Sequence, residues 1–244
     1  MKRLCNILSP LYYSNKKRRR ISYKEFYDET ANNDFEYKKR EIRKWYSNKK
    51  SGTDLFTVYD FAWMLNPESK FLMLSIENDI LQDEAQAVPT DFLSALLLGA
   101  AAKYFIIEVR RSNLIEDSLN VLSKAGENGK KPLKVKFHGE QGVDAGGVAK
   151  EFFQLVIKQI FDPAYSMFNY NEETRTYWFN PDTFEARIKF ELIGFIIGLA
   201  LYNSVILDIH FPRIVYKKLL GLETDFEVDQ KVSFFRTWKT SRPP

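Results

Sequence analysis

The sequence LKVKFHGEQGVDAGGVAKEFFQLVIKQI, residues 133–160, decides the fold of the second half of the chain. Its first five residues alternate apolar and polar side chains, a pattern that predicts a strand with one buried face. A glycine-rich turn follows, GEQGVDAGG at 139–147, after which apolar residues recur at helical spacing up to Ile160. The stretch therefore predicts a strand, a tight turn and an amphipathic helix in direct succession.

The residues downstream of this stretch predict a hairpin and two more helices. Residues 168–170 and 176–179 are strand-prone segments separated by a short polar loop, which predicts a β-hairpin. A long apolar helix is expected at 184–202, a connector at 207–211 and a short helix at 212–221. Capping-box spacing marks three expected helix starts: Ser22 with Glu25, Asn113 with Glu116, and Asp182 with Glu185.

The residues upstream are expected to be mainly helical. A charged helix is predicted at 35–50 and another from Pro67 onward, and a strand at 105–109 precedes a helix that ends near Gly126. The segment 92–107 is apolar but shorter than the ~20 residues that a bilayer span needs, so we expect a buried helix running into the strand. The sequence alone thus predicts an α+β, mainly helical fold with short strands and a β-hairpin.

Cysteine and histidine usage excludes several kinds of chemistry. The chain contains one cysteine, Cys5, and two histidines, His138 and His210. One cysteine cannot form a disulfide framework and fits a reducing compartment. These three side chains also cannot supply the usual four Cys/His ligands of a zinc site. The first residues lack an apolar core of secretory-signal length, so we expect a cytoplasmic protein, with the nucleus as the alternative. We also expect no cofactor and no membrane span.

Charge is distributed unevenly along the chain. Residues 1–50 carry 15 Lys/Arg and 6 Asp/Glu, a net charge of +9, whereas the rest carries 21 and 26, a net charge of −5. The densest part is the run Lys16, Lys17, Arg18, Arg19 and Arg20. Because like charges resist packing, we expect residues 1–20 to be a flexible basic leader. The alternatives are a nuclear-import signal and a nucleic-acid patch, and no nucleic-acid-binding motif accompanies the run to favour the latter.

Three further motifs favour structural roles over chemical ones. The turn at 139–147 lacks the Gly-Lys-Ser/Thr end of a P-loop, so its glycines are expected to serve the turn geometry. Gly194 and Gly198 form a GxxxG pair, for which a membrane dimer is one explanation and packing of a core helix against a neighbour is the favoured one. His210 lies two residues from Asp208 on an apolar connector, and we expect it to be a structural histidine.

Three separated motifs resemble the opening of the HECT domain of ubiquitin ligases. They are FHGEQGVDAGGVAKEFFQLV at 137–156, YWFNPDTF at 177–184 and LIGFIIGLALYNSVILDIHFPRIVYKKLLG at 192–221. VRRSNLIEDSLN at 109–120 is similar to the first helix of that domain. ISYKEFYDE at 21–29 and PESKFLMLSIENDILQ at 67–82 resemble the helical lead-in of ligases with the single, E6-associated type of HECT architecture.

This resemblance covers roughly residues 21–221 and implies a division of the chain. The expected parts are a flexible leader at 1–20, a helical extension at 21–105, an incomplete N-terminal lobe of the HECT domain at 106–222 and a divergent tail at 223–244. In the family this larger lobe docks the ubiquitin-conjugating enzyme. A smaller C-terminal lobe carries the cysteine that accepts ubiquitin as a thioester and passes it to a substrate lysine.

The implied partners are a ubiquitin-conjugating enzyme, ubiquitin and protein substrates. Cys5 matches the family's catalytic cysteine neither in position nor in surroundings, so no catalytic residue is carried over to this chain. We expect the 244 residues to stop before the conjugating-enzyme dock and the catalytic lobe, and to be inactive alone. The alternative is a non-catalytic binding or scaffold protein, or a dominant-negative isoform of the full-length ligase.

Overall fold

The chain folds into two compact units, Met1–Ala102 and Lys103–Pro244. The computed structural model describes residues 2–18, 20–28, 35–53, 55–86, 103–140, 146–222 and 224. The boundary expected between residues 105 and 106 falls inside a strand that begins at Phe105, and the structure places it before Lys103 instead.

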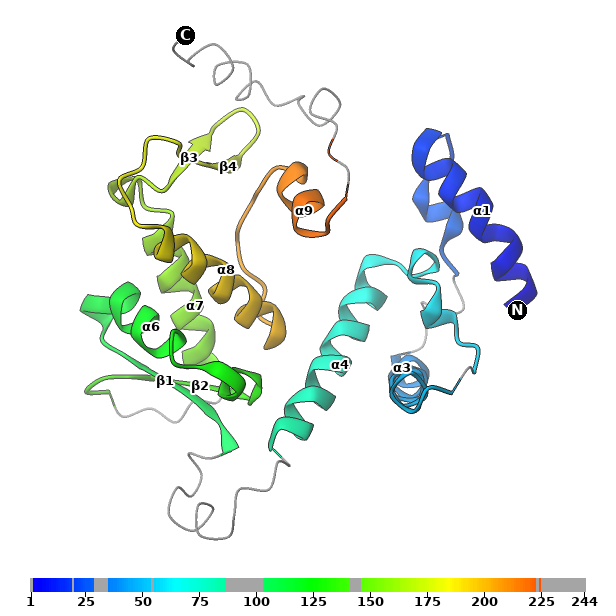
Figure 1. Cartoon of the computed structure of the whole chain (residues 1–244), viewed down its shortest axis with the longest axis horizontal. Coiled ribbons are helices and arrows are strands. Elements are labelled where there is room, and N and C mark those ends of the chain that lie inside the picture. Colours follow the sequence, from blue (N-terminus) through cyan, green and yellow to red (C-terminus); the bar gives the residue numbers. More distant parts are fainter. Residues whose placement is uncertain are drawn as a thin grey trace. The chain divides into compact units, whose positions relative to one another are not determined.

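The first unit is helical in its described part (Figure 1). Its elements are α1 (Lys2–Arg18), η1 (Tyr23–Phe26), α3 (Phe35–Ser51), η2 (Val58–Asp60), η3 (Ala62–Met64) and α4 (Pro67–Gln86). Two apolar clusters hold it together. One joins α3 and α4 through Ile42, Trp45 and Ile76, and the other joins α1 to η1 and η3 through Cys5, Phe26 and Trp63.

The expectation of a flexible leader at 1–20 is wrong for residues 2–18, which form α1. The helix is anchored at both ends. Cys5 is fully buried near its start, and the Asn15 side chain exchanges two hydrogen bonds of 2.8 Å with the backbone N–H and C=O of Ile21. The cations of the basic run follow these anchors at the helix C-terminus, where the helix dipole favours positive charge. Packing and the dipole therefore outweigh the mutual repulsion of the cations.

The basic helix α3 lies against an acidic helix, α4. The Lys50 Nζ lies 2.7 Å from a carboxylate oxygen of Glu84, and the Lys49 Nζ lies 3.9 Å from one of Glu77. Burial raises the pKa of Asp79 on α4, and the nearby cations of α3 act in the opposite direction. Acidic side chains of α4 thus neutralise part of the positive charge of residues 35–51 within the unit. This weakens the nucleic-acid explanation of the basic residues 1–50.

The second unit combines two small sheets with four α-helices in its described residues (Figure 1). Its elements are β1 (Phe105–Val109), η5 (Arg111–Asn113), α6 (Leu114–Leu122), η6 (Gly126–Lys130), β2 (Leu133–Phe137), α7 (Gly147–Ile160), η7 (Pro163–Tyr165), β3 (Phe168–Asn171), β4 (Thr176–Phe179), α8 (Arg187–Tyr202) and α9 (Arg213–Leu219). β1 and β2 are parallel, with Phe105 opposite Leu133, and β3 and β4 form an antiparallel hairpin. The α+β, mainly helical fold is confirmed.

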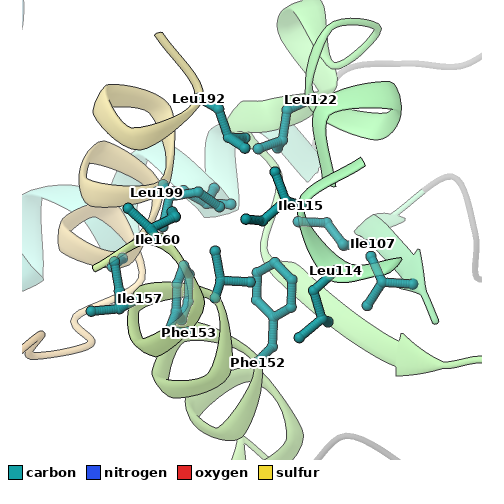
Figure 2. Close-up of a cluster of buried hydrophobic side chains, with 14 of the residues drawn as sticks. Ile107, Leu114, Ile115, Leu122, Phe152, Phe153, Ile157, Ile160, Leu192 and Leu199 are labelled. Atoms are coloured by element: carbon teal, nitrogen blue, oxygen red, sulfur yellow. The ribbon is translucent and has the colours of Figure 1, made fainter. Parts of the chain in front are cut away.

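The core of the second unit lies where α6, α7 and α8 meet beside the parallel strands. Figure 2 shows Phe152 and Phe153 of α7, Ile115 of α6 and Leu199 of α8 converging on one cluster. Phe152 and Phe153 are both fully buried, with ring centroids 5.4 Å apart. The helical spacing read from residues 147–160 therefore marks the face of α7 that is buried.

The β-hairpin, the strand at 105–109 and the short helix after Pro212 are confirmed. The start of the long apolar helix is wrong by three residues, because α8 begins at Arg187 and the Asp182–Glu185 capping box does not form. Instead the Asp182 N–H donates to the Asn180 side chain, and the Glu185 N–H donates to the Thr183 hydroxyl. These local side-chain bonds stabilise turns in place of a first helical turn.

The glycine pair of α8 faces open space, so the expected packing against a neighbour is wrong for the described residues. Gly194 and Gly198 are both exposed, and a methyl group added at either would meet no atom within 4 Å. The expected buried helix at 92–104 lies outside the described residues. Among the helices that are described, none has the length and apolar character required to cross a membrane.

Candidate functional site

Cys5 lacks the surroundings of a reactive thiol. Its side chain is fully buried in the first unit, and its Sγ lies 3.6 Å from the Sδ of Met64. A reactive cysteine needs solvent access and cations that favour the thiolate. Cys5 instead contributes to the apolar cluster that fixes α1, as a small hydrophobic residue does.

We expect the Cys5 thiol to react with alkylating reagents at least ~100-fold more slowly in the native chain than in denaturant, because the reagent must wait for α1 to detach. The measurement is the labelling rate with and without denaturant, followed by mass. Equal rates in both conditions would show that α1 is not docked.

The basic run is placed at the end of α1. Lys16 and Arg18 in the last turn of the helix and Arg20 just beyond it are exposed, while Arg19 lies outside the described residues, as does the Lys17 side chain. The hydrogen bonds between Asn15 and Ile21 bring the two ends of the run together. The exposed cations Lys16, Arg18 and Arg20 are therefore presented next to anchored structure.

Arg111 bridges the two sides of the glycine-rich turn. Its guanidinium binds Glu140 at the start of the turn, with Nη2 3.0 Å from Oε2, and Glu151 on α7, with Nη1 2.8 Å from Oε1. The same group lies 3.9 Å from the centre of the Phe137 ring. The hydrogen bonds from Arg111 lower the pKa of Glu140 and keep this carboxylate charged. Glu140 is thus a structural anion and not a general acid.

The glycines at the two ends of this turn have the backbone geometry expected of them. Gly139 has φ +82° and Gly146 has φ +89°, values that favour glycine. Residues 141–145 between them, including Gly142 and Asp144, lie outside the described residues. At the described ends of the turn, the glycines therefore have the structural role of allowing positive φ angles.

A second arginine–carboxylate pair fixes the start of α6. Asp117 accepts hydrogen bonds from the Arg110 side chain at 2.7 and 2.9 Å and from the Arg110 backbone N–H at 2.8 Å. These bonds lower the pKa of Asp117 to about 2. The ionised carboxylate thus joins the end of β1 to α6.

This pair gives the second unit an acid-dependent component of stability. Because the pKa of Asp117 is lower in the folded chain, the contribution is present above its unfolded value of 3.8 and is lost as pH falls through about 2. We expect Asp117→Asn to melt at a lower temperature than the wild type at pH 6, and the gap to vanish near pH 2. A gap that stays constant with pH in melting curves would contradict this assignment.

The pair formed by His210 and Asp208 is solvated. Both side chains are exposed, with 3.5 Å between Nδ1 and Oδ1. The backbone carbonyl of His210 accepts a 2.7 Å hydrogen bond from the N–H of Tyr177, so this segment fixes the hairpin. In the described part of the chain, no three His, Cys, Asp or Glu side chains gather closely enough to hold a metal ion.

A groove with a volume of about 810 Å³ lies in the second unit. Its walls come from one face of α7, the start of β4 and the residues that follow α8. The lining residues are Lys150, Phe153, Gln154, Ile157, Lys158, Phe161, Asp162, Pro163, Tyr177, Ser204, Val205, Ile206, Leu207 and Asp208. No nucleophilic thiol or histidine lines it, so the groove has the character of a binding surface.

Sequence reasoning did not find the Arg111 bridge or the groove. Arg111 lies two residues after the end of a strand, and its two acidic partners lie at the start of the glycine-rich turn and in the helix that follows it, so the charge signs are compatible with the bridge. The groove joins α7 to residues 204–208, about 50 positions apart, which no local pattern reveals.

Comparison with known proteins agrees with this fold. A family model described as HECT-domain (ubiquitin-transferase) matches residues 154–236. The matched range ends within residues 223–244, for which a divergent tail is expected. It includes the second half of α7, the hairpin, α8 and α9.

Curated relatives point to the same family. The chain is 40% identical over 169 residues to the probable E3 ubiquitin-protein ligase HERC4 of Homo sapiens, which covers 67% of this chain and 16% of that protein. It is 33% identical over 234 residues to the probable E3 ubiquitin-protein ligase HERC3 of Homo sapiens, covering 91% of this chain and 22% of that protein.

The third relative is the probable E3 ubiquitin-protein ligase HECTD2 of Mus musculus, 36% identical over 208 residues, or 82% of this chain and 26% of that protein. The chain thus spans only about a sixth to a quarter of the length of these relatives. By its fold, its motifs and these matches, the chain belongs to the HECT-domain family of ubiquitin-protein ligases.

Proposed function

We propose that this chain is part of a ubiquitin-protein transferase, and that its 244 residues do not carry out the transfer alone. In this reaction a cysteine thiolate takes ubiquitin from the conjugating enzyme's thioester, and a substrate lysine then takes it by forming an amide bond. The chemistry requires an accessible thiolate. The observation that carries the second part of the proposal is the complete burial of Cys5, the single cysteine of the chain.

The role of the second unit in this proposal is scaffolding. Its core includes Phe168 of the hairpin, and the family match to residues 154–236 supports its assignment to the N-terminal lobe. The conjugating-enzyme dock and the catalytic lobe are taken to lie outside these residues. The partners of the whole protein would be a conjugating enzyme, ubiquitin and protein substrates.

Multiple-turnover ubiquitination tests this function. The purified chain is incubated with activating enzyme, ATP, ubiquitin and several conjugating enzymes in turn, with a complete HECT ligase as the positive control. We expect no ubiquitin chains above the level made without the 244-residue chain. Sustained chain formation that depends on it would overturn the inactivity of these residues.

A non-catalytic role in partner binding is the second candidate. The first unit favours this role, because it has two apolar clusters of its own. One of them holds α1, so the exposed cations at the end of this helix have a fixed position. Such a unit retains its surface without a catalytic lobe and would compete with a full-length ligase for shared partners. Addition of the chain in excess should then lower substrate ubiquitination by that ligase, and an unchanged rate would count against competition.

We further propose that the chain is cytoplasmic and enters the nucleus through Lys16–Arg20. The exposure of Lys16, Arg18 and Arg20 supports recognition by an acidic receptor groove. A fluorescent fusion with the run changed to glutamine should lose nuclear signal relative to the wild-type fusion. Glutamine replacement of Lys49 and Lys50, which pair with α4, is the matched control and should leave the distribution unchanged.

A further inference from the structure

The groove of the second unit is apolar along its floor and charged along its rim. Phe153 and Ile157 of α7 are buried in its wall, whereas Ile206 on the opposite side is 84% exposed. An exposed isoleucine beside an apolar groove leaves surface that gains free energy when it is covered. The groove therefore has the properties of a docking surface for an apolar protein segment.

Charged side chains of both signs line the groove. Along α7 they run from the exposed Lys150 and Lys158, two helical turns apart, to Asp162 just after the helix. Asp208, in the segment after α8, also lines the groove. Among the described residues neither lysine takes part in an ion pair, so a segment with acidic residues first and basic residues later would complement this rim.

Residues 225–239 of the same chain, DFEVDQKVSFFRTWK, have this order of charge. Their acidic residues come first and their basic residues later, with apolar and aromatic residues between. The acidic members are Asp225, Glu227 and Asp229; the basic members are Lys231, Arg236 and Lys239; the large apolar members are Phe226, Val228, Val232, Phe234, Phe235 and Trp238. The placement of this segment lies outside the described residues.

The segment is tethered within reach of the groove. The lining residues 204–208 and the segment are separated by the 16 residues 209–224, of which 7 form α9, a helix only about 10 Å long. After α9 the Leu222 N–H donates to the Lys217 carbonyl at 2.9 Å and Gly221 has φ +64°, which turns the chain back on itself. The family match is also continuous from α7 to residue 236, so both parts belong to one domain.

We propose that the groove between α7 and residues 204–208 binds residues 225–239 of the same chain. Lys150 and Lys158 meet the acidic first half, Asp162 and Asp208 meet the basic second half, and the aromatic side chains cover Ile157 and Ile206. The binding is independent of any transferase activity.

Cysteine cross-linking on the full chain tests this docking. In a Cys5→Ala background, which removes the single natural thiol, Gln154→Cys on the groove face of α7 is combined with Ser233→Cys. The matched control combines Ser233→Cys with Asn120→Cys, which is exposed on α6 outside the groove. Disulfide formation under mild oxidation is quantified by peptide mass spectrometry, and melting curves confirm that each variant folds.

We expect the 154–233 intrachain disulfide to form roughly ten-fold faster than the 120–233 one, because docking raises the effective concentration of the two thiols. Lys158→Glu should reduce this preference, and adding Asp229→Lys should restore it. Equal rates at the two positions would overturn the proposal. A disulfide that forms mainly between two chains would also overturn it and would assign the groove to a second copy.

Discussion

Phe152→Ala is expected to lower the free energy of unfolding of the second unit by about 3–5 kcal/mol. The Phe152 side chain is fully buried in α7, with its ring against Phe153 and inside the cluster that joins α6, α7 and α8. Its removal loses apolar burial and leaves a cavity that the neighbouring helices fill only in part. Because domains are typically stable by about 5–15 kcal/mol, this one change should bring the unit close to unfolding.

Hydrogen exchange measured by mass spectrometry separates the two units. In Phe152→Ala, protection should fall in β1, α6 and α8 and remain unchanged in α3 and α4. Asn120→Ala, at an exposed position on α6 outside the groove, is the control and should change stability by no more than about 0.5 kcal/mol. A comparable loss in both variants would mean that α7 does not organise this core.

Trp63→Ala should have a similar effect on the first unit, also about 3–5 kcal/mol. The Trp63 ring stacks on Tyr12 of α1, with centroids 5.2 Å apart, and meets the edge of Phe26 at 6.2 Å. It is the largest side chain that connects η3 to α1 and η1. Its loss should detach α1, so that Cys5 becomes accessible to alkylation.

The control for this change is Tyr13→Ala. Tyr13 is 58% exposed and contacts Tyr12 edge to face, but it is not part of the cluster around Trp63. We expect this variant to lose at most about 1 kcal/mol, the size of an aromatic pair. If Trp63→Ala left Cys5 as protected as in the wild type, the docking of α1 through this cluster would be wrong.

Local patterns were sufficient where the structure depends on short-range geometry. The strand at 105–109 was predicted from its apolar character ahead of a helix signal, the hairpin from two strand-prone segments, and α9 from Pro212 and Gly221. Each of these features depends on neighbours a few residues away, which the sequence displays directly. The three main motifs that resemble the HECT family, at 137–156, 177–184 and 192–221, lie in this second half of the chain.

Long-range contacts explain what the sequence did not show. Cys5, Leu8, Tyr12 and Asn15 recur at helical spacing and mark the inner face of α1, but the conspicuous cations after them led to the expectation of a flexible leader. The partner that buries Cys5 is Met64, 59 residues away. The groove likewise depends on the packing of α7 near residues 204–208, which are distant in sequence. The open space beside Gly194 depends on which elements pack against α8, and the sequence of α8 does not show this.

Single-turnover ubiquitin loading tests the central claim most directly, namely that this member of the HECT-domain family holds no ubiquitin-accepting thiol within its 244 residues. The purified chain is mixed with activating enzyme, ATP, ubiquitin and each of several conjugating enzymes, and the products are separated with and without reductant. We expect no reductant-sensitive adduct between the chain and ubiquitin, because Cys5 is buried in the cluster that holds α1. An adduct that disappears in Cys5→Ala would contradict the account and would make Cys5 an acceptor.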